Sequence, residues 1–311
     1  MPETVAAKEA ALTRPEAKVG AGLALAVFGA IAFSGKAIIV KLAYRYGVDA
    51  VTLIMLRMLF ALPIFAVMAW WASRGQPPLS GRDWAGVVGL GFSGYYLSSF
   101  LDFAGLAYVS ASLERLILYL NPTLVMLLGW LLYRKTWRAM QLAGMAISYA
   151  GVILVFGHEV KLQGEQTVLG ALLILASALT YAVYLVYSGQ LVKRLGSLRL
   201  VGLATSVACL CCLLQFVLLR PLGSALTVAP QVIWLSVLNA TLCTAVPVLL
   251  VMMAIERIGP AITAQTGMIG PLSTILMGVL ILGEPFTAWI AGGTVLVIAG
   301  IFVFSRGAAP R

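Results

Sequence analysis

The chain carries the same pattern of prolines and glycines twice, 149 positions apart. Residues 109–151 contain Pro122, Gly129, Gly144 and Gly151, and residues 258–300 contain their equivalents. These equivalents are Pro271, Gly278, Gly293 and Gly300. Because proline and glycine fix backbone geometry and close packing, their coincidence at one shift indicates a repeat more strongly than matched leucines do. The sequence therefore predicts two copies of one unit, at residues 19–157 and 167–306.

Each copy is apolar enough to lie in a membrane. Of the 311 residues, 61% are hydrophobic and 10% are charged, and a soluble core cannot bury that much apolar surface. Long apolar runs without period-2 alternation predict helices that close their own hydrogen bonds in lipid. The sequence contains ten such runs, and each has close to the ~20 residues that cross a bilayer. They predict an all-α integral membrane protein with ten transmembrane helices. The runs are 19–40, 50–71, 84–107, 111–133, 140–156, 169–187, 198–219, 233–255, 261–282 and 288–304.

The positive charges predict the orientation. With the N-terminus inside, the inner segments hold fourteen Lys and Arg residues and the outer segments only Lys41, Arg45, Lys161 and Arg220, which is a positive-inside bias. Residues 1–18 are expected to be a cytoplasmic tail, because the run at 19–40 is too long for a signal peptide and no small-residue cleavage site follows. Both termini are then cytoplasmic, in a multi-pass protein of the cell inner membrane. The net charge of +10 is explained by topology and does not indicate nucleic-acid binding.

An odd number of spans, five, separates equivalent positions, so the second five-helix repeat is predicted to be inverted relative to the first. Inverted repeats are typical of secondary transporters, in which the two halves alternate to open a central site to either face. The expected partners are therefore a small-molecule substrate and membrane lipid. A monomer is expected, with an oligomer as the alternative.

The repeated motifs resemble those of the EamA-type drug/metabolite transporters. The carrying residues are Ala111-Ser112-Leu113, Asn121-Pro122, Gly129, Gly144 and Gly151, then Pro271, Gly278, Gly283-Glu284, Gly293 and Gly300, and Arg57 in the second span. The resemblance implies ten helices in two inverted repeats. Within the family, this sequence is similar to the branch of bacterial amino-acid exporters. It implies alternating-access export of amino acids, including aromatic and apolar ones, and related metabolites. Where the family has Gly-Glu after the fourth span this chain has Tyr133-Arg134, so a role of that glutamate carries over only to Glu284.

Five charged residues are expected in the outer third of the bilayer, where charge is costly and is usually paired or functional. Three of them are cations and two are acids, which suggests an ion-pair cluster with one positive charge uncompensated. Two interpretations remain open: a structural network that holds helices together, or an outer gate that attracts a substrate carboxylate. The residues are Lys36, Arg57, Asp102, Glu114 and Arg115.

Polar and aromatic residues at helical spacing mark faces that point into the bundle, because polar groups facing lipid lack partners. Each of them could make an ordinary interhelical hydrogen bond. Together they suit a wide amphipathic cavity for substrate. The candidate substrate-binding residues are Phe33, Tyr95, Ser99, Tyr119, Tyr181, Tyr184, Asn239, Thr244 and Gln265.

Prolines inside spans remove a hydrogen bond and loosen the helix. The symmetric pair Pro122 and Pro271 are candidate hinges, with simple packing kinks as the alternative. Gly144 with Gly151, and Gly293 with Gly300, are expected to form tight seams between helices or subunits.

Other classes find little support in the spans. An intramembrane enzyme needs clustered nucleophiles, histidines or metal-binding acids. The spans contain no histidine and no acidic pair at i, i+3 or i+4, and the cysteines at 209, 211 and 212 are expected to be buried in packing, so we expect no catalytic residue, metal or cofactor. A channel fits the inverted repeat less well. Export of drugs, organic cations or other metabolites stays open, as does coupling, either to protons through Asp102, Glu114, Glu256 or Glu284 or to no ion at all. His158 is expected in a solvated outer loop.

Overall fold

The computed structural model describes residues 3–133, 138–267 and 269–308, and within these ranges every regular element is helical. Seven of the thirteen α-helices form the first part of the chain. They are α1 (Glu3–Tyr44), α2 (Ala50–Ser73), α3 (Gly81–Leu90), α4 (Ser98–Leu106), α5 (Ala111–Leu118), α6 (Asn121–Tyr133) and α7 (Ala139–Gln163). The second part contains α8 (Gln166–Leu195), α9 (Ser197–Leu219), α10 (Pro230–Ala240), α11 (Val246–Thr266), α12 (Ile269–Met277) and α13 (Ala288–Ala308). Short turns of other helix types are η1 (Gly91–Leu97), η2 (Leu222–Ala225), η3 (Thr241–Ala245) and η4 (Gly278–Leu282).

Seven helices in the described ranges are long and apolar enough to cross a membrane. They cover seven of the ten predicted runs, at 19–44, 50–73, 111–132, 139–161, 166–189, 197–219 and 230–251. The three other runs fall on shorter apolar helices at 272–282 and 288–304 and on the consecutive helices α3, η1 and α4. Several bounds differ from the prediction: α1 begins at Glu3 rather than at residue 19, α7 continues beyond residue 156, and α11 continues to Thr266 through the expected start of the ninth span.

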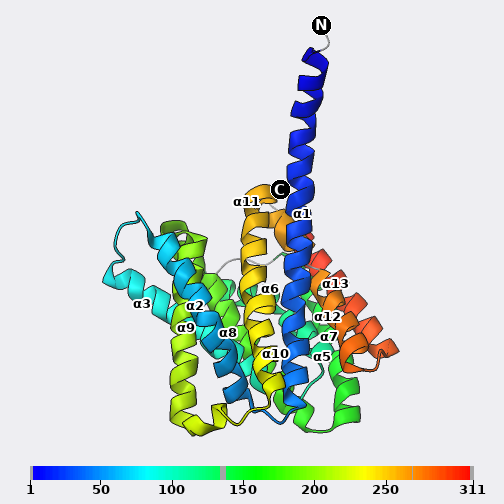
Figure 1. The fold of residues 1–311 in the computed structure, drawn as a ribbon. Coiled ribbons are helices and arrows are strands. Elements are labelled where there is room, and N and C mark those ends of the chain that lie inside the picture. The colour runs from blue at the N-terminus through cyan, green and yellow to red at the C-terminus, as the bar shows by residue number, and fades with distance from the viewer. Residues whose placement is uncertain (1–2, 134–137, 268, 309–311) are drawn as a thin grey trace.

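The helices form one bundle in which α1 projects beyond the others at its N-terminal end, and both ends of the chain lie on that same side (Figure 1). Large apolar side chains cover the exterior, among them Leu218, Leu280 and Trp234. Charged and polar side chains such as Glu114, Asp102 and Asn239 are buried instead. Soluble proteins place polar side chains outside, whereas a protein surrounded by lipid places apolar side chains outside and buries the polar ones.

The loop before α2 supplies an N-terminal cap for that helix. The Asp49 carboxylate accepts hydrogen bonds from the backbone N–H groups of Val51 and Thr52 at 3.0 and 3.3 Å, which satisfies two donors of the first turn. Partial burial raises the pKa of Asp49, but hydrogen bonds from Thr52 and Arg220 outweigh it, so this pKa lies below its usual value. The cap therefore stays charged and fixes where α2 begins.

Local irregularities recur at equivalent places in the two copies. Shifting the π-helical turn η1 by 149 positions gives residues 240–246, which contain the π-helical turn η3. In the first copy the helix is interrupted between α5 and α6, at Tyr119 and Leu120. In the second copy it is interrupted after Thr266, one residue from the equivalent place. Such interruptions are frequent at functional sites of helical membrane proteins.

The interruption changes the interpretation of the two candidate hinges. Pro122 is the second residue of α6 and lies in its first turn, where proline is tolerated because that N–H has no helical partner. The chain is therefore broken before Pro122 rather than kinked at it. The backbone of Pro271 lies in the first turn of α12, and its side chain is outside the described residues.

The repeated glycines form a seam between α7 and α13 within one chain. A Cβ on Gly144 would lie 2.5 Å from the Phe304 nitrogen and 2.6 Å from the Gly300 carbonyl oxygen. A Cβ on Gly151 would lie 2.6 Å from the Gly293 carbonyl oxygen. Of the two expected kinds of seam, the structure contains the one between helices, and α7 and α13 approach each other backbone to backbone.

Replacing Gly144 by alanine is expected to destabilise the protein by about 1–3 kcal/mol, because overpacking a close contact forces the backbones apart. The matched control is Gly157→Ala on the same helix, where an added Cβ meets nothing within 4 Å. Thermal unfolding of both variants in detergent measures the difference. Equal melting temperatures for the two variants would contradict the seam.

Candidate functional site

Two cavities lie along α1 at different depths. The proximal cavity, nearer the N-terminal end of α1, has a volume of about 320 Å³. Its lining combines small residues, two aromatic rings, three hydroxyls and one cation. The lining residues are Ala26, Gly29, Ala30, Phe33, Ser34, Arg115, Tyr119, Val251, Thr263, Gly267 and Gly270.

The two helix interruptions meet at the proximal cavity. The Tyr119 hydroxyl, at the first interruption, donates to the Gly267 carbonyl oxygen at the second, over 3.3 Å. From α1, the Ser34 hydroxyl donates to the Gly270 carbonyl oxygen at 2.8 Å. A Cβ on Gly270 would approach both hydroxyl oxygens, at 3.3 and 3.4 Å, so a glycine is suited to this contact. The ends of four helices, α5, α6, α11 and α12, are thus brought to one place.

An ion cluster separates the two cavities. Lys36 on α1 contacts the Asp102 carboxylate at 2.5 Å and the Glu114 carboxylate at 3.5 Å, so one ammonium bridges acids from α4 and α5. Arg115 contacts Glu114 at 3.9 Å. Glu114 has no exposed surface and Asp102 only 2%. Four of the five predicted charges are therefore brought together as two cations and two carboxylates.

Arg115 extends from this cluster into the proximal cavity. It is 9% exposed, and its Nε and Nη2 atoms are buried without a hydrogen-bond partner. Its contact with Glu114 is an ion pair beyond hydrogen-bond distance. Buried guanidinium donors left without acceptors are costly. The guanidinium can therefore donate hydrogen bonds to a ligand oxygen in the cavity, and a carboxylate matches a guanidinium best.

The fifth predicted charge, Arg57, lies apart from the cluster. Its Nε donates to the Thr244 hydroxyl at 3.1 Å, and its guanidinium carbon lies 5.2 Å from the centre of the Phe103 ring. No carboxylate of the described ranges is within ion-pair distance of it. Thr244 in turn donates to the Asn239 carbonyl oxygen within the same helix. Arg57 thus contacts the π-helical turn η3 and lines neither cavity.

Three of the predicted tyrosines form a cluster of their own. The Tyr95 and Tyr184 hydroxyls are 3.1 Å apart, and the Tyr181 and Tyr184 rings stack with centroids 5.5 Å apart. They pack with Val87, Leu90 and Leu200 and line neither of the two cavities. Gly94 makes room for this cluster, because a Cβ there would overlap the Tyr184 ring.

The remaining candidates are dispersed. Phe33 and Tyr119 line the proximal cavity, as a substrate-binding role requires. Ser99 on α4 and the buried Asn239 on α10 line neither cavity. The side chain of Gln265 lies outside the described residues, as does Arg134 of the predicted departure from the Gly-Glu motif.

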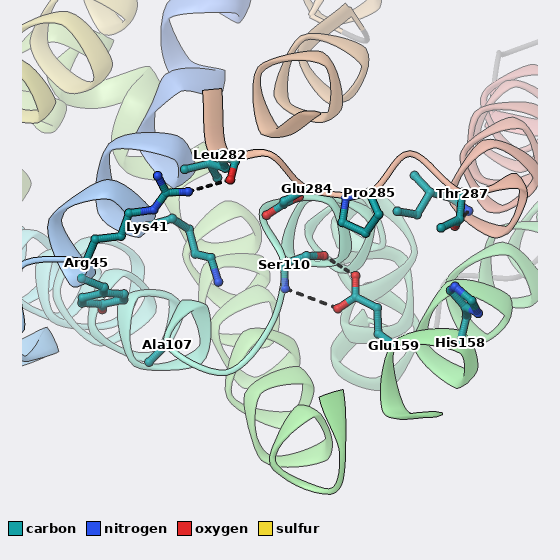
Figure 2. Close-up of a pocket in the computed structure, with 12 residues that line it drawn as sticks. Lys41, Arg45, Ala107, Ser110, His158, Glu159, Leu282, Glu284, Pro285 and Thr287 are labelled. Atoms are coloured by element: carbon teal, nitrogen blue, oxygen red, sulfur yellow. Dashed lines mark hydrogen bonds between the residues drawn. The ribbon is translucent and has the colours of Figure 1, made fainter. Parts of the chain in front are cut away.

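The distal cavity, of about 370 Å³, lies at the opposite end of the ion cluster. In Figure 2, Lys41 and Arg45 of α1 lie on one side of it and Glu159 and His158 of α7 on the other, with Glu284 between them. The rest of its wall comes from Tyr44, Ala107, Ser110, Leu282, Pro285, Thr287 and Ile290.

The start of α5 is held at this cavity by one carboxylate from α7 and one from the loop after η4. Glu284 accepts hydrogen bonds from the Ala111 N–H at 2.8 Å, the Ser112 N–H at 3.3 Å and the Ser112 hydroxyl at 2.9 Å. Glu159 accepts hydrogen bonds from the N–H and the hydroxyl of Ser110. Carboxylates at a helix N-terminus satisfy its free donors and its dipole. Glu284 thereby joins the second copy to the first.

Sequence reasoning missed Glu159 and misplaced His158. The fifth span was predicted to end at residue 156, but α7 continues to Gln163 and carries both residues. His158 stacks on Trp289 with ring centroids 5.6 Å apart, so it is not in a loop. The run Gly157-His158-Glu159 is polar in composition, and no periodic signal indicated that the helix continues.

The described part of the chain contains no group of three or more His, Cys, Asp or Glu side chains able to hold a metal ion. Its four cysteines are free thiols.

Comparison with known proteins places this geometry in a family. The model of the EamA-like transporter family matches residues 20–157 and again residues 168–306. A protein of Bacillus subtilis (strain 168), named Uncharacterized transporter YcbK, is 30% identical over 275 residues, covering 86% of this chain and 87% of its own length. An Archaeoglobus fulgidus protein named Uncharacterized transporter is 23% identical over 272 residues, covering 87% of this chain and 92% of its own length. A solved structure titled Crystal structure of protein has a TM-score of 0.59 at 20% identity, covering 91% of this chain and 97% of that one, and so shares the fold.

Proposed function

We propose that this chain, which belongs to the EamA-like transporter family, exports amino acids through the cell inner membrane by alternating access. Membership makes the chain a transporter and, with its apolar helices, a multi-pass membrane protein. The proposal adds the substrate class and the direction. The preferred substrates are amino acids with apolar or aromatic side chains.

The observation that carries the proposal is the unsatisfied guanidinium of Arg115 in the wall of the proximal cavity. A substrate carboxylate in the cavity would place its negative charge beside this guanidinium, whose ion pair with Glu114 is long at 3.9 Å. An organic cation would instead be repelled by the one charged group of that wall. This feature favours carboxylate-bearing substrates over the alternative of drugs and organic cations.

The helix ends around the same cavity suit the other charge of an amino acid. The C-terminal ends of α5 and α11 carry partial negative charge and favour an ammonium group, whereas the start of α12 carries partial positive charge. Interrupted helices use their ends in this way in other secondary transporters. Phe33, Ala30 and Val251 leave an apolar wall for the side chain.

We further propose ten spans in two inverted repeats, with both termini in the cytoplasm. The two family matches, the interruptions at equivalent positions and the common side of the two chain ends support this topology (Figure 1). The proximal cavity then faces the cytoplasm, and the bridge from Glu284 to α5 closes the opposite side. The ion cluster around Lys36 is the barrier between the two cavities.

Flux into liposomes with purified protein tests the proposal. The panel contains radiolabelled L- and D-phenylalanine, L-leucine, L-glutamate and the organic cation tetraphenylphosphonium. We expect saturable and stereoselective flux of the apolar L-amino acids, with no transport of the cation above protein-free liposomes. Transport of the cation alone would support the drug-exporter alternative, and a linear current would indicate a channel.

A further inference from the structure

Charged side chains of both signs line the distal cavity. It is lined by two cations, Lys41 and Arg45, and by two carboxylates, Glu159 and Glu284. Within the described ranges none of the four lies within 4 Å of an opposite charge. Four formal charges therefore surround one cavity without forming an ion pair.

Each charge is held in place by neutral groups. Lys41 donates to the Val109 carbonyl oxygen at 2.8 Å, and Arg45 donates to the Leu282 carbonyl oxygen at 2.6 Å. The two carboxylates accept from the first residues of α5 and from Ser110. These contacts fix the positions of the charges, and none of them supplies a formal counter-charge within 4 Å. The cations therefore lie on α1, Glu159 lies across the cavity on α7, and Glu284 of the loop after η4 lies between them (Figure 2).

A ligand with one charge would compensate one side of the cavity and be repelled by the other. A zwitterion of matching length compensates both, since complementary charge selects the partner and its orientation. Tyr44, Leu282 and Ile290 provide apolar surface for a side chain.

We propose that the distal cavity is a second binding site, which takes an apolar or aromatic amino acid as its zwitterion, with the carboxylate toward Lys41 and Arg45 and the ammonium toward Glu159 and Glu284. This inference rests on the proposed function, because it takes the exported molecule to be an amino acid. The site lies beyond the ion cluster on the path out of the cell. It holds the amino acid after the cluster has opened and before release.

Equilibrium dialysis of purified full-length protein with tritiated L-phenylalanine counts the sites. The wild-type protein is expected to bind two molecules per chain, Arg45→Gln one, Arg115→Gln one, and the double variant none. The matched control is Arg220→Gln, which removes another exposed arginine near the start of α2 that lines neither cavity and should keep two sites. Glu159→Gln keeps acceptors for Ser110 and is expected to lose the distal site as Arg45→Gln does.

Two analogues test the zwitterion itself in the Arg115→Gln protein, where only the distal site remains. Phenethylamine lacks the carboxylate and 3-phenylpropionate lacks the ammonium, and each is expected to bind at least about tenfold more weakly than L-phenylalanine. Binding of either analogue as tightly as L-phenylalanine overturns the inference. If Arg115→Gln does not fold, the comparison of wild type with Arg45→Gln decides alone.

The outcomes separate the two proposals. One site that Arg115→Gln removes and Arg45→Gln leaves intact overturns the distal site and supports the proposed function. One site that Arg45→Gln removes and Arg115→Gln leaves intact supports the distal site and overturns the central role of Arg115. Absence of saturable L-phenylalanine binding to the wild-type protein overturns the distal site as stated.

Discussion

Replacing Arg115 by glutamine is expected to lower the transport of carboxylate-bearing substrates by about ten- to a hundredfold. A hydrogen bond to a charged group contributes about 1.5–3 kcal/mol, and each 1.4 kcal/mol is tenfold in affinity. Glutamine retains a polar side chain but not the positive charge or the fork of donors that matches a carboxylate. The measurement is the flux of labelled L-phenylalanine into liposomes at several concentrations, which separates affinity from maximal rate.

The matched comparison is Arg57→Gln. Arg57 is also a buried arginine, but it contacts Thr244 and Phe103 and lines neither cavity. We expect this variant to reduce the yield of folded protein and to leave the apparent affinity of the folded fraction within about twofold of the wild type. Arg115→Lys, which retains the charge, should recover part of the loss. Equal flux for Arg115→Gln and wild type at low substrate concentration would contradict the role given to Arg115.

The sequence predicted the helical membrane architecture because membrane helices follow from local composition. Each apolar run must close its own backbone hydrogen bonds, so run length and charge placement suffice to locate most spans. The ends of helices were predicted less well. α7 passes through Gly157, His158 and Glu159, and α11 passes through Pro260, since neighbouring helices rather than local composition decide where these helices stop.

The candidate site was predicted in part, and the difference has a physical reason. Lys36, Asp102, Glu114 and Arg115 were expected together because buried charges need partners, and the structure brings them together. Helical spacing placed Tyr181 and Tyr184 on one face correctly, but it cannot say which helix covers that face. Tyr95 of η1 covers it, so the tyrosines satisfy one another away from both cavities.

The lining of the proximal cavity was the hardest feature to predict. Gly29, Gly267 and Gly270 carry no chemical group that marks a site. Gly270 leaves space beside the Ser34 and Tyr119 hydroxyls, and Gly29 leaves space beside Val251. Tyr119 and Gly267 meet because the two interrupted helices cross there, which is a property of the assembled fold. The repeat in the sequence predicted which positions are equivalent, but the contact between them depends on how the two copies pack in the folded protein.

The ion cluster is the second place where a single substitution should have a large effect, because Lys36 contacts two carboxylates. Lys36→Met leaves Asp102 without its partner and Glu114 with Arg115 alone, at 3.9 Å. Removing one member of a buried ion pair typically costs about 3–5 kcal/mol, since the remaining charge stays buried. We expect Lys36→Met to lose most folded protein at 37 °C, whereas Lys193→Met, at an exposed lysine, should behave as wild type.

The double variant Lys36→Met with Asp102→Asn should recover more than half of that loss. Each single change leaves the cluster with one unbalanced charge, whereas the double change leaves Glu114 and Arg115 as a neutral pair. The melting temperatures of the four proteins form a thermodynamic cycle whose coupling is expected to exceed about 1 kcal/mol. Additive losses would show that Lys36 and Asp102 act independently, and the cluster could then not serve as a single barrier between the two cavities. Recovery of stability without recovery of L-phenylalanine flux would instead assign the cluster to transport as well as to folding, because a neutral pair restores the charge balance but not the contact that must break and re-form.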